Sequence, residues 1–207
     1  GIAQLRVNVM SPPCAAFPPW PARGDGASAP LVLLVITSGR SRRRQGPARP
    51  SRRGARARLV VAGGAPDAEW HALVARLGLG DAVVFAGDVG AIETLHAAAD
   101  AMLHPTRWDA CSLSTIEAMA AGLPVVNSAA NGAADLIRDG ANGFVLPRAE
   151  DAGRLADIIL ALRDPALRAR IGEAARRSAE GADLAANCRA VEAVLLGCAA
   201  ASGQGSG

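Results

Sequence analysis

The stretch PTRWDACSLSTIEAMAAGLPVV, residues 105–126, combines the clearest helix signals of the chain with two acidic residues. Ser112 is a favourable N-cap and Gly122 a favourable helix stop, so the stretch predicts a short helix between them. Asp109 precedes this helix, and Glu117 lies in its middle. A carboxylate in so apolar a helix needs a partner or access to water, because burying it alone costs several kcal/mol.

The predicted helix has an inward face of Leu113, Ile116 and Ala120, which recur at helical spacing. At its N-terminus the backbone N–H groups of Cys111, Ser112 and Leu113 and the helix dipole favour an anion such as phosphate. Asp109, which precedes the cap, should project over this N-terminal end of the helix. Carboxylates bind hydroxyl groups rather than phosphates, so the two acids suit the sugars on either side of a diphosphate.

The composition indicates one soluble domain. With 207 residues, half of them hydrophobic, the chain can bury one core but not two large ones. It has no apolar run of the roughly 18 to 20 residues that cross a bilayer, and no secretory signal pattern at its N-terminus. The cysteines have neither CxxC spacing nor neighbouring histidines, so neither a zinc site nor a disulfide framework is predicted. The four cysteines are Cys14, Cys111, Cys188 and Cys198. Cysteines without such patterns are typical of a reducing compartment, so we expect a cytoplasmic location.

Positive charge is concentrated in residues 1–58, which hold 11 arginines and one acid, whereas the remainder of the chain is acidic overall. The run GRSRRRQGPARPSRRGARAR has no aromatic residue to stack a base, so we predict no nucleic-acid partner. Eight of the 13 prolines lie before residue 51. We therefore expect residues 1–57 to be irregular and fragmentary, with LVLLVI (31–36) as their only buried strand.

From residue 58 onward, short apolar runs alternate with amphipathic segments. This alternation predicts an α/β fold, a Rossmann-like doubly wound parallel sheet, over residues 58–200, followed by a flexible tail at 201–207. The expected strands are 57–64, 81–87, 101–105, 123–128 and 143–147, and the expected helices are 67–80, 90–100, 112–122, 132–140, 151–164 and 165–181.

Ligands of such folds bind at the carboxyl ends of the strands. The segments that follow the predicted strands should therefore meet on one rim of the sheet. They are Gly63 and Gly64, Gly87 to Val89, His104 to Ser112, and Asn127 to Gly132.

Several motifs occur here in an order that resembles the donor-binding half of retaining glycosyltransferases of family four (glycosyltransferase group 1), which are two-domain GT-B enzymes. They are RLVVAGG (58–64), VVFAGDV (83–89) and LHAAADAMLHPTRWDACSLSTIEAMAAGLPVVNSAANGAADLIRDGANGFVL (95–146). The family signature is an acid, seven residues and a glutamate, then a helix ending in GxPVV, matched here by Asp109, ACSLSTI, Glu117 and AMAAGLPVV. The resemblance covers residues 58 to about 180 and is strongest to lipopolysaccharide-core glucosyltransferases.

The resemblance implies transfer of a sugar from UDP-glucose or a similar nucleoside-diphosphate sugar to a glycan or lipid-linked acceptor, such as lipopolysaccharide core. Glu117 would hold the ribose hydroxyls, and Asp109, in place of the more common glutamate, would contact the donor sugar. The amides of Ser112 and Leu113 would face the diphosphate. The full set of donor-binding residues implied in this way is Gly63, Gly64, Gly87, Asp88, Val89, Ala110, Cys111, Ser112, Leu113 and Glu117, with Gly87 to Val89 against the base.

The chain also departs from the family pattern. In the family an arginine and a lysine after the first strand stabilise the leaving diphosphate, but this chain has no lysine, and Arg40 is the nearest candidate for the arginine. The resemblance implies a missing N-terminal acceptor domain and a cytoplasmic parent enzyme, with association at the inner face of the membrane left open. No cofactor or metal is predicted. The alternative function is a catalytically inactive nucleotide-binding fragment.

The histidines have structural explanations beside functional ones. His104 ends a predicted strand, where it either contacts the donor or simply fills the core or the rim. His71 and His96 lie on amphipathic helices, so we predict that they are surface or boundary residues.

The residues after the predicted strand 123–128, and Glu117, also have both a functional and a structural explanation. Asn131 and Gly132 either belong to a ligand loop or cap the next helix, and Asp135 either meets the ligand or complements that helix's dipole. Glu117 has a structural explanation too, as an acid that complements the dipole of its own helix.

Overall fold

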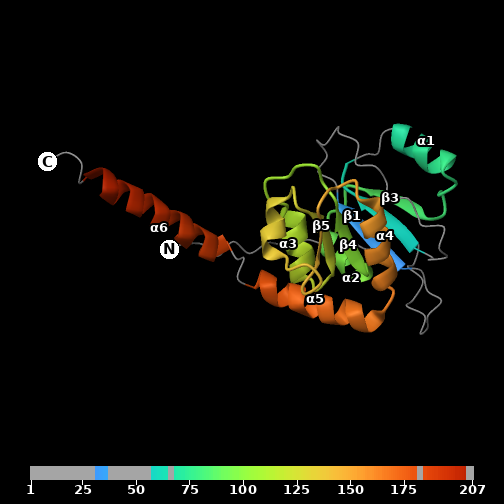
Figure 1. The fold of residues 1–207 in the computed structure, drawn as a ribbon. Helices are drawn as coiled ribbons and strands as arrows, with labels where there is room; N and C mark the ends of the chain where they lie inside the picture. Colours follow the sequence, from blue (N-terminus) through green and yellow to red (C-terminus); the bar gives the residue numbers. More distant parts are fainter. Residues whose placement is uncertain (1–30, 37–56, 65–67, 181–183, 204–207) are drawn as a thin grey trace.

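The fold is a parallel six-stranded sheet covered by helices (Figure 1). The computed structural model describes residues 31–36, 57–64, 68–180 and 184–203. The strands lie in the order β3-β2-β1-β4-β5-β6, and every neighbouring pair is parallel. They are β1 (Leu31–Ile36), β2 (Ala57–Ala62), β3 (Val83–Gly87), β4 (Ala101–His104), β5 (Val125–Ser128) and β6 (Phe144–Leu146). The predicted doubly wound α/β fold is confirmed.

The helices follow the predicted order, with one exception. They are α1 (Ala68–Arg76), α2 (Ile92–Ala98), α3 (Leu113–Ala120), α4 (Ala152–Ala161), α5 (Pro165–Ala179) and α6 (Leu184–Gly203). Where an α-helix was expected over 132–140, the chain forms only the short 3₁₀ helix η1 (Gly132–Leu136). The Asn142 side chain accepts a hydrogen bond from the Arg138 N–H at 2.6 Å and donates one to the Leu136 carbonyl at 2.9 Å. The Asn142 side-chain amide therefore satisfies backbone groups of Arg138 and Leu136 that a continuing helix would pair with its own backbone.

Strand β1 lies in the centre of the sheet, paired with β2 on one side and β4 on the other. The run LVLLVI is thus a buried strand as predicted, and its Leu33 and Leu34 are both buried. The sheet therefore takes a central strand from before residue 58, where the domain was expected to begin. The expected irregular structure of residues 1–30 and 38–56, and the tail at 204–207, lie outside the described residues.

Two hydrophobic clusters cover the two faces of the sheet. One joins Leu34 and Met102 to helices α2, α3 and α5, and the other joins Leu33 and Leu103 to α4. Consecutive residues within β1, and likewise within β4, thus enter opposite clusters, because successive side chains of a strand point to opposite faces of the sheet. The near-continuous apolar composition of these strands follows from burial on both faces.

Helix α3 shows a different phase from the predicted one. Ser112 caps it and Gly122, with φ of +79°, follows its end, as expected. The buried face, however, consists of Thr115, Ala118 and Met119. The prediction of an inward face formed by Leu113, Ile116 and Ala120 is wrong: Leu113 and Ala120 are exposed and Ile116 is half-buried. The predicted face was chosen from apolar residues alone, whereas the buried face includes the polar residue Thr115.

Close packing against α5 fixes that phase. A Cβ on Gly172 would lie 2.1 Å from the carbonyl oxygen of Gly122, so the two segments touch backbone to backbone. Ala118 and Met119 of α3 share a cluster with Ala175 of α5. Small residues at this contact allow the close approach and leave the opposite face of α3 to solvent.

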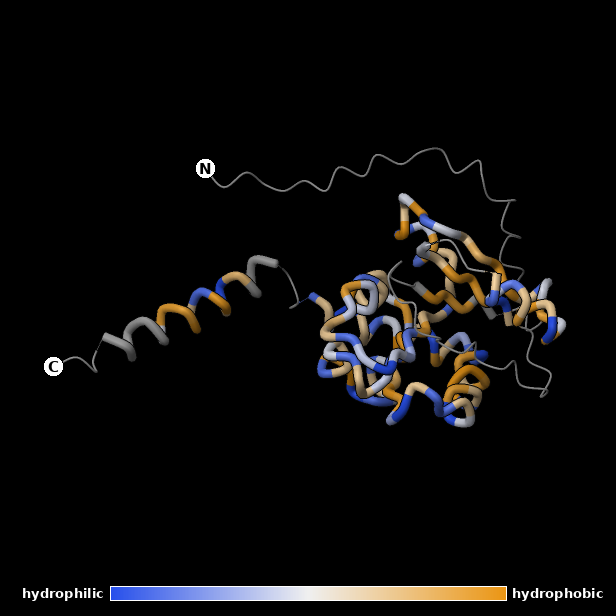
Figure 2. The backbone as a smooth tube through the Cα atoms, turned by 90° about the horizontal axis from the view of Figure 1, so that it is seen from above, coloured by the Kyte–Doolittle hydropathy of each residue, from blue (hydrophilic) through white to orange (hydrophobic). Residues whose placement is uncertain are grey.

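Helix α6 extends away from the sheet (Figure 1). The hydropathy colouring in Figure 2 shows apolar stretches on this separate helix. They include Val191, Val194, Leu195 and Leu196, all of which are exposed. Within the described residues, no helix is long and apolar enough to cross a membrane.

The two helical histidines behave differently. His71 is exposed, as predicted, with its ring 4.8 Å from that of Phe85. His96 is only 4% exposed, so the prediction of a surface or boundary position is wrong. It lies on the side of α2 that packs toward the sheet, and burial lowers its pKa below the usual 6.5, an effect that nearby Glu93 partly opposes.

Burial of neutral His96 predicts a pH-dependent stability. Below pH 6.5 the unfolded chain takes up a proton that the folded chain resists, so the free energy of unfolding should fall as the pH is lowered through this range. Urea unfolding between about pH 7.5 and 5.5 should show a steeper loss for wild type than for His96→Leu. The control is His71→Leu, at an exposed position, which should keep the wild-type slope. An identical slope in His96→Leu and wild type would contradict this origin.

Candidate functional site

The strand order places the candidate site beside β4. Chain connections run outward from β1 through β2 to β3 and then return to β4 on the other side of β1, so the order reverses between β1 and β4. Ligands of open α/β sheets bind outside the carboxyl ends of the strands at such a reversal. The loop of residues 105–112 follows β4 at this point and leads into α3.

The loop after β4 is joined to the loop after β5 through its backbone. The Asp109 N–H donates to the Ala130 carbonyl, and the Gly132 N–H donates to the Asp109 carbonyl, both at 3.1 Å. A Cβ on Gly132 would lie 2.0 Å from the Ala110 carbonyl oxygen, so this close approach requires glycine.

Asn131 strengthens the connection with a buried side chain. Its Oδ1 accepts hydrogen bonds from the Ser112 N–H at 3.2 Å and from the Ala133 N–H at 2.9 Å, and the residue is 1% exposed. One amide oxygen thus holds the start of α3 and caps η1. The capping explanation for Asn131 is confirmed, and the additional bond to Ser112 was not anticipated.

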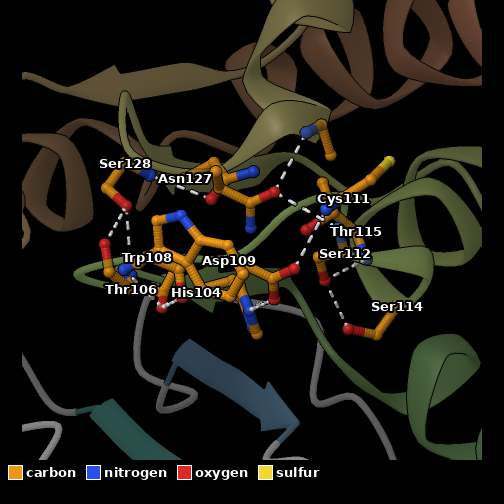
Figure 3. Close-up of polar contacts among 12 residues, drawn as sticks. His104, Thr106, Trp108, Asp109, Cys111, Ser112, Ser114, Thr115, Asn127 and Ser128 are labelled. Carbon is orange, nitrogen blue, oxygen red and sulfur yellow. Dashed lines mark hydrogen bonds and ion pairs between the residues drawn. The ribbon is translucent and has the colours of Figure 1, made fainter.

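A second connection lies closer to the strands (Figure 3). The Thr106 N–H donates to Ser128 Oγ at 3.1 Å, and the Ser128 hydroxyl donates to the Thr106 carbonyl. The Ser128 N–H in turn donates to Asn127 Oδ1 at 2.9 Å. The sequence placed Thr106 and Ser128 in segments expected on the same rim but did not predict the hydrogen bonds between them. The sequence signal that could have indicated a role is their position: Thr106 closely follows the buried strand β4, and Ser128 ends the buried strand β5.

Asp109 lies beside the start of α3, as expected, with both carboxylate oxygens engaged (Figure 3). Its Oδ1 accepts a hydrogen bond from the Cys111 N–H at 3.1 Å, and its Oδ2 lies 3.4 Å from His104 Nε2. The side chain keeps 33% of its surface exposed. The carboxylate is therefore oriented by its neighbours and still accessible to a ligand.

The amide groups at the start of α3 are only partly available. Of the three that were expected to meet an anion, Cys111 donates to Asp109 and Ser112 donates to Asn131. The Thr115 N–H donates to Ser112 Oγ at 3.3 Å, the N-cap bond. Among the described residues, the Leu113 and Ser114 N–H groups have no acceptor, so these two donors remain available.

Glu117 points to solvent from the second turn of α3. Leu113, four residues earlier and therefore on the same face of the helix, is 70% exposed. Trp108, next to Asp109, is 79% exposed. Within the part of the chain that the structure describes, the Glu117 carboxylate makes no hydrogen bond or ion pair. The acid in the apolar helix is thus exposed to solvent, with the exposed Leu113 on the same face of the helix.

The remaining predicted site residues form a separate unit at the ends of β2 and β3. The Gly63 N–H donates to the Gly87 carbonyl, and the Gly64 N–H donates to Asp88 Oδ1, both at 2.7 Å. Gly63, Gly64 and Gly87 have positive φ angles, which explains the glycines. Val89 is half-buried against the core. Because all strands are parallel, this unit and the α3 start lie at the same edge of the sheet.

A protein-family model for glycosyl transferases group 1 matches residues 40–178, which is more than half of the chain. The chain belongs to the glycosyl transferases group 1 family. The match contains all the site residues described above, from Gly63 to Gly132.

Two curated relatives show the range of this glycosyltransferase family. The chain is 37% identical over 122 residues to the D-inositol 3-phosphate glycosyltransferase of Streptomyces avermitilis, covering 57% of this chain and 26% of that enzyme. It is 34% identical over 127 residues to the lipopolysaccharide glucosyltransferase WaaG of Escherichia coli K12, covering 61% of this chain and 34% of WaaG. The chain thus spans about a quarter to a third of the length of these relatives.

Solved structures share the fold. One is Anabaena HepE in complex with UDP-glucose, to which the chain is similar with a TM-score of 0.62 and 26% sequence identity. The similarity covers 74% of this chain and 44% of HepE. The chain is therefore a glycosyltransferase domain with the Rossmann-like half of a GT-B structure.

Gly132→Ala should separate the two loops that hold Asp109. The added Cβ would meet the Ala110 backbone rather than a flexible side chain, so we expect a loss of about 1 to 3 kcal/mol in unfolding free energy and faster hydrogen exchange at the Ser112 amide. The matched control is Gly90→Ala, since a Cβ there has no atom within 4 Å. Equal stability and equal exchange in the two variants would show that the loops are not coupled in this way.

Proposed function

We propose that this chain is the donor-binding domain of a retaining glycosyltransferase, and that it holds a nucleoside-diphosphate sugar such as UDP-glucose. The observation that carries the proposal is the arrangement at the start of α3, where an oriented carboxylate just before the helix is followed by two free amide donors in its first turn and an exposed glutamate in its second turn. Similarity to a HepE structure that contains UDP-glucose supports the choice of donor.

In this proposal each group meets a different part of the donor. Glu117 accepts hydrogen bonds from the ribose hydroxyls, and Asp109 accepts them from the sugar. The Leu113 and Ser114 N–H groups face the diphosphate between them, where the positive end of the helix dipole also favours negative charge. Since the Ser112 amide already donates to Asn131, we assign the diphosphate contact to these later amides. The unit of Gly87 to Val89 lies against the base.

We further propose that the acceptor is a glycan or lipid-linked sugar, such as lipopolysaccharide core. The similarity to WaaG supports this acceptor class. Because the chain spans about a third of WaaG, we assign the acceptor site to residues outside this chain and expect the parent enzyme to work at the cytoplasmic face of a membrane.

A catalytically inactive nucleotide-binding fragment is the second candidate. The absence of lysine from the whole chain favours it, because the family uses a lysine and an arginine to stabilise the leaving diphosphate. Arg40, the nearest candidate for the arginine, lies outside the described residues.

Calorimetric titration with UDP and UDP-glucose tests the two acids separately. A charge-assisted hydrogen bond contributes about 1.5 to 3 kcal/mol, so Glu117→Gln should weaken binding of both ligands by roughly 10- to 150-fold. Asp109→Asn should leave UDP affinity almost unchanged and weaken UDP-glucose alone, because Asp109 meets only the sugar.

The same variants test the structural explanation for Glu117. If Glu117 only complements the helix dipole, Glu117→Gln should cost about 0.3 to 1 kcal/mol of stability and leave both affinities unchanged. Asp157→Asn provides the control, since Asp157 is an exposed acid within α4, a helix that packs on the opposite face of the sheet from α3. Wild-type UDP affinity in Glu117→Gln, with a lowered melting temperature, would end the case for ribose binding.

The isolated 207-residue chain should transfer little or no sugar from UDP-glucose, even if it binds the donor. Without an acceptor site the attacking hydroxyl is not held in place, and positioning can contribute roughly 7 to 11 kcal/mol of barrier reduction. A radiolabelled-donor assay with candidate glycan acceptors measures this. Robust transfer by the purified chain would contradict the assignment of the acceptor site to residues outside it.

A further inference from the structure

His104 is a buried polar residue directly beneath the candidate site. It ends strand β4 and is 8% exposed. Its Nε2 lies 3.4 Å from Asp109 Oδ2, and Figure 3 shows the imidazole and the carboxylate facing each other. Of the three histidines in the chain, His71 and His96 lie on other helices and contact neither acid of the site.

The surroundings of the ring determine which nitrogen carries the proton. His104 Nδ1 is buried and has no hydrogen-bond partner among the described residues. A proton on Nδ1 would therefore be a buried donor without an acceptor, which costs about 1 to 3 kcal/mol. A proton on Nε2 instead has the Asp109 carboxylate as its acceptor. The imidazole thus donates through Nε2 to Asp109.

This donation complements the bond from the loop backbone. The Cys111 N–H binds one oxygen of the Asp109 carboxylate and His104 binds the other, so rotation of the carboxylate would break at least one of these bonds. Each oxygen retains a second lone pair, and one third of the side chain is exposed. The carboxylate is thus held in one orientation with acceptor capacity still free.

We propose that His104 is the positioning residue of Asp109: its Nε2–H fixes the carboxylate in the orientation that receives hydroxyl groups of the donor sugar. This inference rests on the proposed function, in which Asp109 meets the sugar. His104 itself touches no ligand, since its side chain is buried beneath the loop.

A purely structural role for His104 makes different predictions. If the ring only fills space at the end of β4, then His104→Phe, which keeps an aromatic ring, should be tolerated and His104→Gln should be the worse variant. If the N–H donor matters, the order reverses. The Gln side chain can place an amide N–H near the position of Nε2, whereas Phe offers no donor.

Titrations with two ligands separate these roles. We expect His104→Phe to weaken UDP-glucose binding by roughly 3- to 10-fold, because binding must then immobilise a freer Asp109 side chain, and to leave UDP affinity within about twofold of wild type. His104→Gln should restore most of the UDP-glucose affinity. His71→Gln, at an exposed position on α1, should match wild type for both ligands. Equal weakening of both ligands, or wild-type UDP-glucose affinity in His104→Phe, would overturn the proposal.

Nitrogen NMR of the free protein tests the contact without any ligand. The His104 imidazole should be the Nε2–H tautomer, with an Nε2 proton that exchanges slowly with water and is lost to exchange in Asp109→Ala. A predominant Nδ1–H tautomer would overturn the proposal. If wild type binds neither ligand, the proposed function fails and so does the role of His104 toward a sugar, whereas the NMR result still decides whether the orienting hydrogen bond exists.

Discussion

One buried oxygen atom, Oδ1 of Asn131, holds together the two loops on which the candidate site depends. It accepts from the backbone at the start of α3 and from the first turn of η1. Removing it would leave two backbone donors without an acceptor, at a cost of about 1 to 3 kcal/mol for each one that stays buried. The two backbone bonds between Asp109 and the loop after β5 run alongside it. Together these bonds fix the acid, the helix start and the neighbouring loop as one unit before any ligand arrives.

That rigidity has a consequence for ligand binding. A carboxylate already held by the Cys111 amide and by His104 loses little conformational freedom when it accepts a sugar hydroxyl, which favours affinity. Glu117 has no such support from the described residues and is exposed to solvent, so binding must replace its contacts with water by contacts with ligand hydroxyls. The exposed Trp108 and Leu113 beside these acids provide apolar surface that a ligand or the rest of a longer enzyme would cover.

Local sequence signals predicted the features that depend on local chemistry. Alternating apolar runs gave the strands, and the Ser112 cap and the Gly122 stop gave the bounds of α3. The features that depend on tertiary packing were not predictable in this way. The phase of α3 depends on its backbone contact with Gly172, which no pattern within the helix reveals. Burial of His96 likewise depends on how α2 packs on the sheet.

In the candidate site, too, the features set by nearby residues were predictable and those set by distant residues were not. The position of Asp109 beside the helix start could be deduced from the N-cap, because both are determined within a few residues. The bond between Asn131 and Ser112 and the bond between Ser128 and Thr106 could not, because the partners lie 19 and 22 residues apart in the chain. The bonds of His104 and Ser112 further show why a motif alone gives an incomplete site: it names the acids but not the groups that orient them or occupy neighbouring amides.

The most direct test of this account is a crystal structure of the protein with UDP-glucose bound. The account predicts that the ribose hydroxyls lie about 2.5 to 3.0 Å from the Glu117 carboxylate, that the diphosphate faces the Leu113 and Ser114 amides, and that a sugar hydroxyl binds Asp109. A uridine diphosphate bound elsewhere on the sheet edge, or bound here with Glu117 left in solvent, would contradict it.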